Sequence, residues 1–475
     1  MHRIDQIPSL HPRNLVNRIE APMLGKLPTE QQQTMWAPPL EMMLNPDHQL
    51  VKLAKRLPWE KLEAEFGSLY AAVGRPSIPI RVMVSLLLLQ RMFDVSDEQV
   101  VKQWVQNPYW QNFSGMTSFQ WKIPCDPTEL IKFRARIGRE GAEKLLAWTI
   151  ATHQREGNVQ AETVIIDSTV QEKNITTPRD HKLYRRIAER LLALAASEGV
   201  VLRRSYRRTI RKQIMQLRTA NFPRARKQAR RAERRLKTIA GALLRDVQRK
   251  LTPERLEIHE ETFGTMTKIL TQGRGGPDHI YSLHEPQAYC IGKGKDRAKY
   301  EFGTKVTLAI DPTTCVIVGA LNHQQNVYDG HVTAEAREQI EDLTGTKPTI
   351  MVGDHGYRGT DMVTALAEDG TQVITPVNLR KSIKGTVEHR RLRKLLAKRS
   401  RIEAVIGHLK AEHRLCRNYL HGVLGDELNV LLAAVGWNLK KLMRLLWLLP
   451  EEVFESLEMV IAMWDRSDRG RVVLD

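Results

Sequence analysis

The stretch Thr163-Val164-Ile165-Ile166-Asp167 decides the fold, because it is a short run of β-branched residues that ends in an acid. Such a run predicts a buried strand. A second run of the same kind, Thr349-Ile350-Met351-Val352-Gly353-Asp354, also ends in an aspartate. Side chains at the carboxyl ends of strands in an α/β sheet converge on one edge. We therefore expect Asp167 and Asp354 to lie close together.

Three more strands are predicted around these two. Residues 300–310 and 315–321 are joined by the turn Asp311-Pro312-Thr313-Thr314 and should form a hairpin, and residues 372–376 form the fifth strand. Helical patterns lie at 332–343, 361–368 and 392–415. An antiparallel pair followed by β-α-β units predicts an α/β domain with a mixed five-stranded sheet.

The chain before the first strand is helical in character. Residues 46–157 show helical periodicity, and Ser96-Asp97-Glu98-Gln99 is a typical helix start. We expect an all-α N-terminal domain there, a candidate for DNA binding or dimerisation. Residues 96–110 could form a helix-turn-helix reader or pack as ordinary helices, and both interpretations stay open. Residues 1–45 show no period and are expected to form a loosely structured arm.

A strongly basic segment interrupts the α/β pattern. Residues 179–250 hold 23 Lys and Arg against five Asp and Glu, which is nearly all of the chain's net charge of +19. Helical patterns within it predict a basic helical insertion at 179–265, so the α/β domain comprises residues 158–178 and 266–475. Charge runs are usually solvated faces, but so lopsided an excess favours contact with DNA phosphates. The candidate contacts are Arg203, Arg204, Arg207, Arg208, Arg211, Arg230, Arg231, Arg234 and Arg235.

The composition limits the class of protein. With 475 residues, of which 42% are hydrophobic, the chain can build two or three domains. Its four cysteines are scattered without zinc-ligand spacing, which fits a reducing cytoplasm. Association with the nucleoid is expected only because nucleic acid is the expected partner. Its most apolar stretches are too short or too interrupted by charge to span a bilayer. Nucleic acid, and not a membrane, is therefore the expected anionic partner.

A third acid comes from the helical pattern at 392–415. Arg399, Glu403, Lys410 and Arg414 share a stripe along the border of its apolar face. Glu403 can therefore lean over the sheet edge that bears the two aspartates. Mg²⁺ prefers oxygen ligands, and two such ions can clamp the attacking and leaving oxygens of a phosphoryl displacement. Cationic side chains beside the acid fit a path for phosphates.

These residues resemble the motifs of a known family. Arg399-x-x-x-Glu403-x-x-x-x-x-x-Lys410 resembles the signature around the last acid of the IS-five family of insertion-sequence transposases, within the DDE superfamily, although Leu396 stands where that family usually has a Tyr. Residues 165–169 and 352–359 resemble its first and second acid motifs. Residues 300–305 and 326–331 resemble its intervening segments, and residues 50–150 its N-terminal domain.

The resemblance implies an RNase H-like catalytic core in which Asp167, Asp354 and Glu403 bind two Mg²⁺ or Mn²⁺ ions. Such a core hydrolyses a strand at the element's end, and the freed 3′-hydroxyl attacks target DNA. The implied partners are double-stranded DNA, as terminal inverted repeats and target, and a second copy of the chain in a synaptic dimer or higher assembly. His355, Tyr357 and Asp329 are candidates for supporting residues.

Two alternatives share this scaffold. One is a catalytically inactive DNA-binding protein, against which the presence of all three acids argues. The other is a nuclease that cleaves without joining strands, which the sequence does not separate from a transposase.

Overall fold

The computed structural model describes residues 25, 27, 38–70, 77–219, 222–273, 276, 278–292, 300–359 and 361–448. It divides into two compact units, residues 1–141 with 440–475 and residues 142–439, and each is described by itself. Among the described residues, none of the helices combines the length and the apolar character that a bilayer crossing needs.

The N-terminal unit is helical, as predicted. Its described elements are α1 (Leu40–Met43), α2 (Gln49–Arg56), α3 (Trp59–Gly67), α4 (Ile80–Phe93), α5 (Asp97–Gln106), α6 (Pro108–Phe113) and the first part of α7 (Pro127–Arg155). The predicted arm at 1–45 lies mostly outside the described residues. Its last part is structured, because Leu40 in α1 is fully buried.

The segment 96–110 forms α5 and the start of α6, with its large aromatic side chains packed inside the unit, and its role as a DNA reader stays a prediction. Ser96 Oγ accepts a hydrogen bond from the Gln99 amide at 3.2 Å, and Gln99 Oε1 accepts one from the Ser96 amide at 3.0 Å, which confirms the predicted helix start. The side chains of Trp104, Trp110 and Phe113 are buried. These aromatic rings belong to the core of the unit, so they are not available to stack on bases.

The predicted end of the helical domain at residue 157 differs from the structure. Gly138 has a φ of 60° inside α7, which divides this helix into two segments. The second segment belongs with the α/β unit, because Asn438 donates to Thr149 Oγ1 at 3.1 Å and the His153 ring contacts the Asn438 carbonyl at 3.0 Å. The compact α/β unit comprises residues 142–439, and residues 449–475 of the predicted α/β domain lie outside the described residues.

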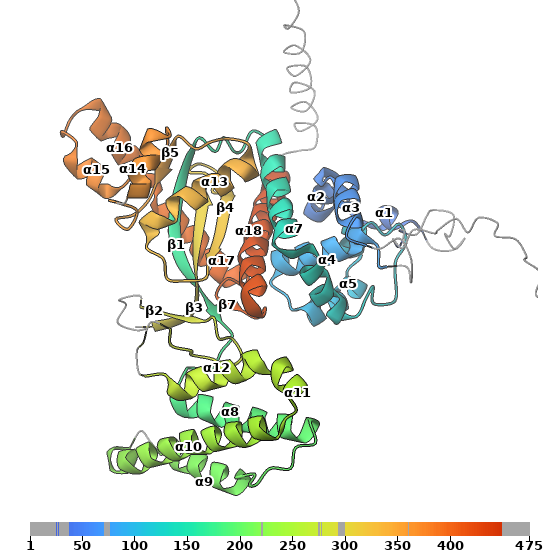
Figure 1. The fold of residues 1–475 in the computed structure, drawn as a ribbon. Coiled ribbons are helices and arrows are strands. Elements are labelled where there is room, and N and C mark those ends of the chain that lie inside the picture. Colours follow the sequence, from blue (N-terminus) through green and yellow to red (C-terminus); the bar gives the residue numbers. More distant parts are fainter. Residues whose placement is uncertain are drawn as a thin grey trace, which may run out of the picture. The chain divides into compact units, whose positions relative to one another are not determined.

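A mixed sheet forms the centre of the second unit (Figure 1). Its strands are β1 (Thr163–Lys173), β2 (Tyr289–Gly292), β3 (Tyr300–Ile310), β4 (Ile317–His323), β5 (Ile350–Val352), β6 (Gln372–Ile374) and β7 (Arg417–Asn418). The path β2-β3-β1-β5-β6 is extended by β4 on β3 and β7 on β1. The sheet thus has seven strands and not the five predicted, because β2 and β7 are too short to show a period in the sequence.

The direction of pairing changes at β1. β1 is antiparallel to β3, which forms a hairpin with β4, while β5 and β6 are parallel to β1 and to each other. This is the predicted order of an antiparallel pair followed by β-α-β units. The arrangement is consistent with an RNase H-like core.

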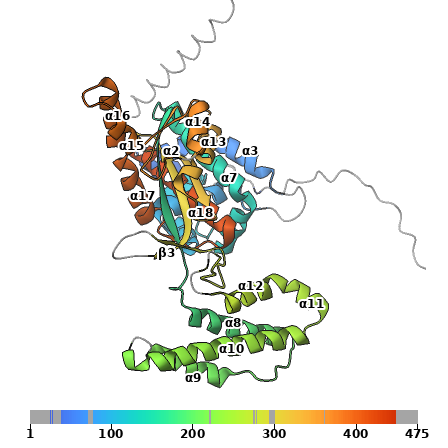
Figure 2. The same ribbon diagram turned by 60° about the vertical axis from the view of Figure 1, so that its left-hand side comes forward.

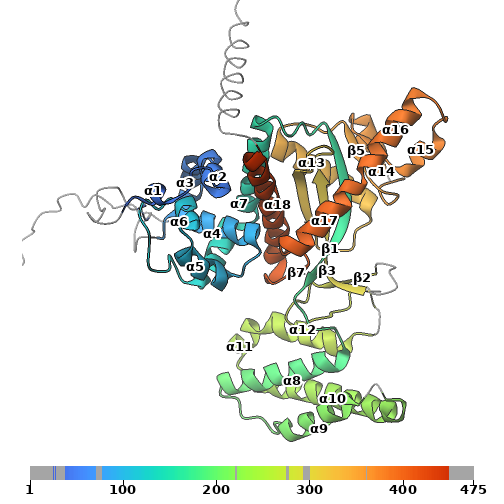
Figure 3. The ribbon, with the colours of Figure 1, turned by 180° about the vertical axis from the view of Figure 1, so that it is seen from behind.

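Helices cover both faces of the sheet. On one face, α13 (Thr333–Thr344) and α14 (Asp361–Glu368) bury a cluster that includes Val164 and Ile166 of β1. On the opposite face lie α17 (Ser400–Glu412) and the start of α18 (Gly422–Leu448) (Figure 3). Successive side chains of a strand alternate between faces, so the odd-numbered residues of β1 point to the α17 and α18 side.

The insertion after β1 is a helical unit with a core of its own. It contains α8 (Asp180–Ser197), α9 (Arg207–Arg218), the short η2 (Pro223–Ala225), α10 (Arg226–Lys250), α11 (Pro253–Ile258) and α12 (Glu260–Thr271). Helices α8, α9 and α12 pack around α10 (Figure 2). The predicted limit at residue 265 falls inside α12, whose Met266 and Ile269 are fully buried in this core. The insertion therefore extends beyond its predicted end.

Candidate active site

The two predicted aspartates lie side by side because of strand register. Ile165 of β1 pairs with Val352 of β5 in parallel. Asp167 comes two residues after Ile165, and Asp354 comes two residues after Val352, so the two aspartates end up opposite each other. Asp167 is still within β1, while Asp354 lies just past the end of β5. Both are partly buried. The local sequence makes the strands, and their pairing brings the acids together.

A third acid, Asp329, lies beside them in the 3₁₀ turn η3 (Asp329–His331). A Cβ added at Gly356 would meet Asp329 Oδ2 at 2.8 Å and Asp354 Oδ1 at 3.0 Å. The Gly356 amide also donates to Asp354 Oδ1 at 2.7 Å. Any larger residue at this turn would therefore have to displace one or both of these carboxylates.

The cluster concentrates negative charge. Burial raises the pKa of Asp167 to about 6, and the charges of Asp354 and Asp329 act in the same direction. The Ser168 amide and the Arg399 guanidinium oppose this effect. Asp329 forms an ion pair with Lys305, whose Nζ lies 2.7 Å from Asp329 Oδ1.

Glu403 lies on α17, which packs against β1 on the same side as Asp167. Its side chain is 59% exposed and pairs with Arg399, whose terminal nitrogen is 3.0 Å from Glu403 Oε1. The same guanidinium acts electrostatically on Asp167. Arg399 thus connects the glutamate to the aspartate cluster, while no hydrogen bond links Glu403 to either aspartate among the described contacts.

The helix predicted at 392–415 is two helices. α16 (Val387–Lys398) and α17 meet at Arg399, and α17 ends at Glu412. Arg414 is therefore not on the helical stripe: it has a φ of 64°, and its guanidinium lies 5.3 Å from the ring centre of Tyr419. Lys410 remains on α17, two turns after Glu403. The sequence pattern did not predict that α17 ends at Glu412, because helical periodicity alone does not mark where a helix ends.

A hydrogen-bonded chain supports the acids from the opposite face of β1. Tyr357 is fully buried, and its hydroxyl lies 2.8 Å from Ser168 Oγ. Ser168 Oγ is 3.1 Å from Thr307 Oγ1, which is 2.8 Å from His323 Nε2. Burial raises the pKa of Tyr357 well above its ordinary value, with Asp329 adding to the effect, and burial lowers the pKa of His323 to about 4. Both groups are therefore neutral at physiological pH.

Of this hydrogen-bonded series, the sequence analysis named Tyr357 as a supporting residue and missed Ser168, Thr307 and His323. Ser168 follows the first acid directly, so its place was readable from the alternation of β1. Thr307 and His323 lie on the hairpin strands and gave no local signal. His355, the remaining predicted supporting residue, is exposed in the turn after β5.

All nine arginines predicted to contact DNA are exposed on the insertion. Those of α10 lie opposite its buried face, which includes Leu236, Ile239 and Leu243, and those of α9 are exposed on that helix. Arg203 and Arg204 lie in the segment before α9. The folded insertion thus keeps its charge on the outside, where phosphates can reach it.

Comparisons with known proteins agree with this architecture. Residues 38–136 match the family model described as "Transposase domain (DUF772)", and residues 272–439 match the one described as "Transposase DDE domain". The chain is also 40% identical over 172 residues to an uncharacterized protein, ORF8 in the nfe locus of Rhizobium meliloti, covering 36% of this chain and 83% of that protein. No solved structure matches.

The chain belongs to the DDE superfamily of insertion-sequence transposases. The second matched range contains Asp354 and Glu403 and begins after the insertion, so β1 with Asp167 lies outside it. Membership makes the transposase an enzyme that acts on DNA and uses a divalent metal ion.

Replacing Asp167 by Asn should stabilise the metal-free transposase above pH 6. Because the pKa of Asp167 is raised from 3.8 to about 6, the folded protein binds more protons between these values, and its stability falls as pH rises through them. The variant avoids this loss, so its melting temperature in EDTA should be higher, by about 2–4 °C per kcal/mol regained.

Thermal unfolding measured over a pH series tests this expectation. The difference between the two proteins should vanish as the pH approaches the ordinary pKa of 3.8. The exposed Asp342→Asn on α13 is the matched control and should show no pH-dependent gain. An Asp167→Asn protein that melts below the wild type at every pH would contradict the electrostatic argument.

Replacing Tyr357 by Phe removes the hydroxyl that contacts Ser168 and should lower the free energy of unfolding by about 1 kcal/mol, the usual net contribution of such a bond. Chemical denaturation measures this change in the free energy of unfolding. Tyr300→Phe, at a side chain that is 63% exposed, is the control and should have no effect. Equal stability of the two variants would show that the buried hydroxyl does not hold β1.

Proposed function

We propose that this transposase cleaves DNA at the ends of an insertion sequence and joins the freed ends to target DNA, with Asp167, Asp354 and Glu403 as ligands of two Mg²⁺ or Mn²⁺ ions. The observation that carries the proposal is the parallel register of β1 and β5, which sets two carboxylates at one sheet edge. Arg399 connects the third carboxylate, Glu403, to this edge, because it pairs with Glu403 and acts electrostatically on Asp167.

The donor set fits hard divalent cations. All three ligands are carboxylates, and Mg²⁺ and Mn²⁺ prefer oxygen. The raised pKa of Asp167, caused first by burial and then by neighbouring acids, marks negative charge that a cation would compensate. Glu403 is more than half exposed, which leaves the site open to a DNA strand on that side.

When bound, two such ions would polarise the scissile phosphate and stabilise the attacking and leaving oxygens. The chain's own residues bind and orient. Asp167 and Asp354 hold fixed positions on paired strands. If Glu403 turns to a metal, it gives up its ion pair with Arg399, whose planar guanidinium then suits a phosphate of the DNA. Lys410 lies about 10 Å further along α17 and continues the same path.

The supporting residues keep this arrangement in place. Lys305 neutralises Asp329, which allows that acid to lie beside Asp354 at the Gly356 turn. Tyr357 anchors the turn to β1. We assign His355, which is exposed directly after Asp354, a supporting role beside the substrate.

The basic insertion serves as the main phosphate-binding surface for double-stranded DNA, either the terminal inverted repeats or the target. Such contacts give affinity without sequence information. The enzyme acts as a homodimer or higher synaptic assembly on DNA in the nucleoid of the cytoplasm, because two ends of an element must be held together. Arg414, directed to Tyr419, contributes less to binding than Arg399 and Lys410.

Metal-dependent nicking of a DNA that carries the element's ends tests the catalytic part. Asp354→Asn and Glu403→Gln should each lower the rate more than about 100-fold, since losing even an outer partner of a metal ligand costs 10–100-fold. Asp361→Asn, on the exposed start of α14, should keep full activity. A pre-cleaved end then separates the alternatives: failure to join it would leave a nuclease, and binding without nicking would leave an inactive DNA-binding protein.

The salt dependence of DNA binding tests the insertion. Changing Arg207, Arg208, Arg211, Arg230 and Arg231 together to Ala should weaken binding and reduce the slope of log K against log salt by up to about 5, roughly one per lost contact. The same five positions changed to Lys are the control and should keep the slope, because the charge remains. An unchanged slope in the Ala variant would rule out the insertion as a phosphate-binding surface.

A further inference from the structure

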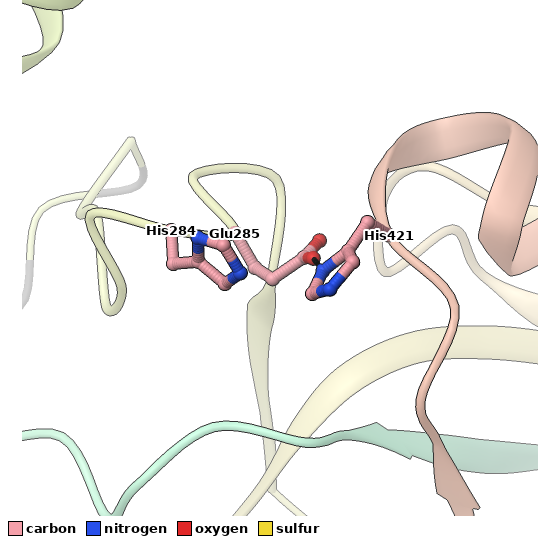
Figure 4. A group of neighbouring side chains, drawn as sticks. All are labelled: His284, Glu285 and His421. Carbon is pink, nitrogen blue, oxygen red and sulfur yellow. Dashed lines mark hydrogen bonds and ion pairs between the residues drawn. The ribbon is translucent and has the colours of Figure 1, made fainter. Parts of the chain in front are cut away.

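A second group of side chains that could bind a metal ion lies apart from Asp167, Asp354 and Glu403. His284, Glu285 and His421 each offer a ligand atom, and these atoms all lie within 4.8 Å of one another. His284 and Glu285 precede β2, and His421 directly precedes α18. Figure 4 shows the carboxylate of Glu285 turned towards the ring of His421. Two segments far apart in the chain therefore converge here.

Glu285 is fixed by buried partners. Its side chain is 4% exposed, and its Oε2 lies 2.9 Å from Lys173 Nζ and accepts from the Gly422 amide at 3.2 Å. Lys173 also pairs with Asp426 at 2.8 Å. The other oxygen, Oε1, faces His421 Nδ1 at 2.6 Å. One oxygen is thus held by the protein, and the other points outward to the histidines.

The two histidines are on the surface. The side chain of His421 is 70% exposed, and His284 is also exposed. Their rings meet edge to face, with centroids 4.6 Å apart. An ordinary hydrogen bond explains His421 beside Glu285, but it does not explain why His284 joins them.

We propose that His284, Glu285 and His421 form a Zn²⁺ site. Two imidazoles and one carboxylate oxygen are a ligand set that zinc takes at tetrahedral centres, with water in the fourth position. Nitrogen ligands favour zinc over Mg²⁺, which prefers oxygen. Lys173 and the Gly422 amide orient the carboxylate through its second oxygen, as outer partners of metal ligands do.

Only small movements are needed to close the site. Zinc bonds of 2.0–2.2 Å in a tetrahedron place ligand atoms roughly 3.4 Å apart. His421 Nδ1 and Glu285 Oε1, now 2.6 Å apart, would separate slightly, and the other ligand atoms, all within 4.8 Å of one another, would adjust to that spacing. Both histidine side chains are exposed and can rotate, while the buried carboxylate stays in place.

The metal would join the chain at the base of the insertion. β1 ends at Lys173, the helical insertion follows, and the chain returns at His284 and Glu285 before β2. A bridge from these residues to His421 would clamp the returning segment to the start of α18. Lys173 is six residues after Asp167 on the same face of β1, about 20 Å away, so the two metal centres are separate.

Isothermal titration of the full chain with Zn²⁺, in excess Mg²⁺ that occupies carboxylate-only sites, tests the proposal. One Zn²⁺ should bind per chain, and His284→Ala and His421→Ala should each weaken that affinity more than about 100-fold. Zn²⁺ should also raise the melting temperature of the wild type and not of these variants. Circular dichroism verifies that the variants fold.

His408→Ala is the matched control. His408 also pairs with a carboxylate, Glu412, at 2.7 Å, but no second histidine completes a described cluster there. This variant should bind Zn²⁺ like the wild type. Zn²⁺ binding that is unaffected by His421→Ala, or that is lost in Asp354→Asn instead, would overturn the assignment, as would the absence of binding. None of these results depends on DNA cleavage.

Discussion

The parallel pairing of β1 with β5 is the constraint on which the rest of the structure depends. It sets Ile165 opposite Val352, so that Asp167 and Asp354, each two residues further along its strand, reach the same edge of the sheet. A slip of one residue would turn one acid to the opposite face, because side chains alternate along a strand. The buried chain from Tyr357 through Ser168 to Thr307 secures this register from the other face of the sheet.

The cost of this arrangement is electrostatic. Asp167, Asp354 and Asp329 lie close enough to raise the pKa of Asp167 beyond the effect of burial. Like charges at short range destabilise the fold. Arg399 opposes this effect at Asp167, and Lys305 pairs with Asp329. Under the proposed function, bound cations would relieve this repulsion, which agrees with the stability–function trade-offs found at active sites.

β1 also connects the sheet edge that carries the two aspartates to the insertion. One end of the strand carries Asp167, and the other ends at Lys173, a buried amine held between Glu285 and Asp426. Breaking a buried ion pair leaves an uncompensated charge, so this group fixes where the chain leaves the sheet and where it returns. The insertion itself has an independent apolar core around α10. Its positive charge therefore lies on the surface of a unit whose core is separate from that of the sheet.

The sequence by itself determined the α/β order, the helical N-terminal unit, the basic insertion and the two strand-end aspartates, because these are written in local periodicity and composition. Only the tertiary structure decided which groups surround them. The approach of Asp329, the ion pair of Arg399 with Glu403 and the end of α17 before Arg414 do not follow from any local period. The ion pair of Lys173 with Glu285 likewise joins residues that are far apart in the sequence. Such charge and hydrogen-bond contacts act across space and produce no periodic pattern in the sequence.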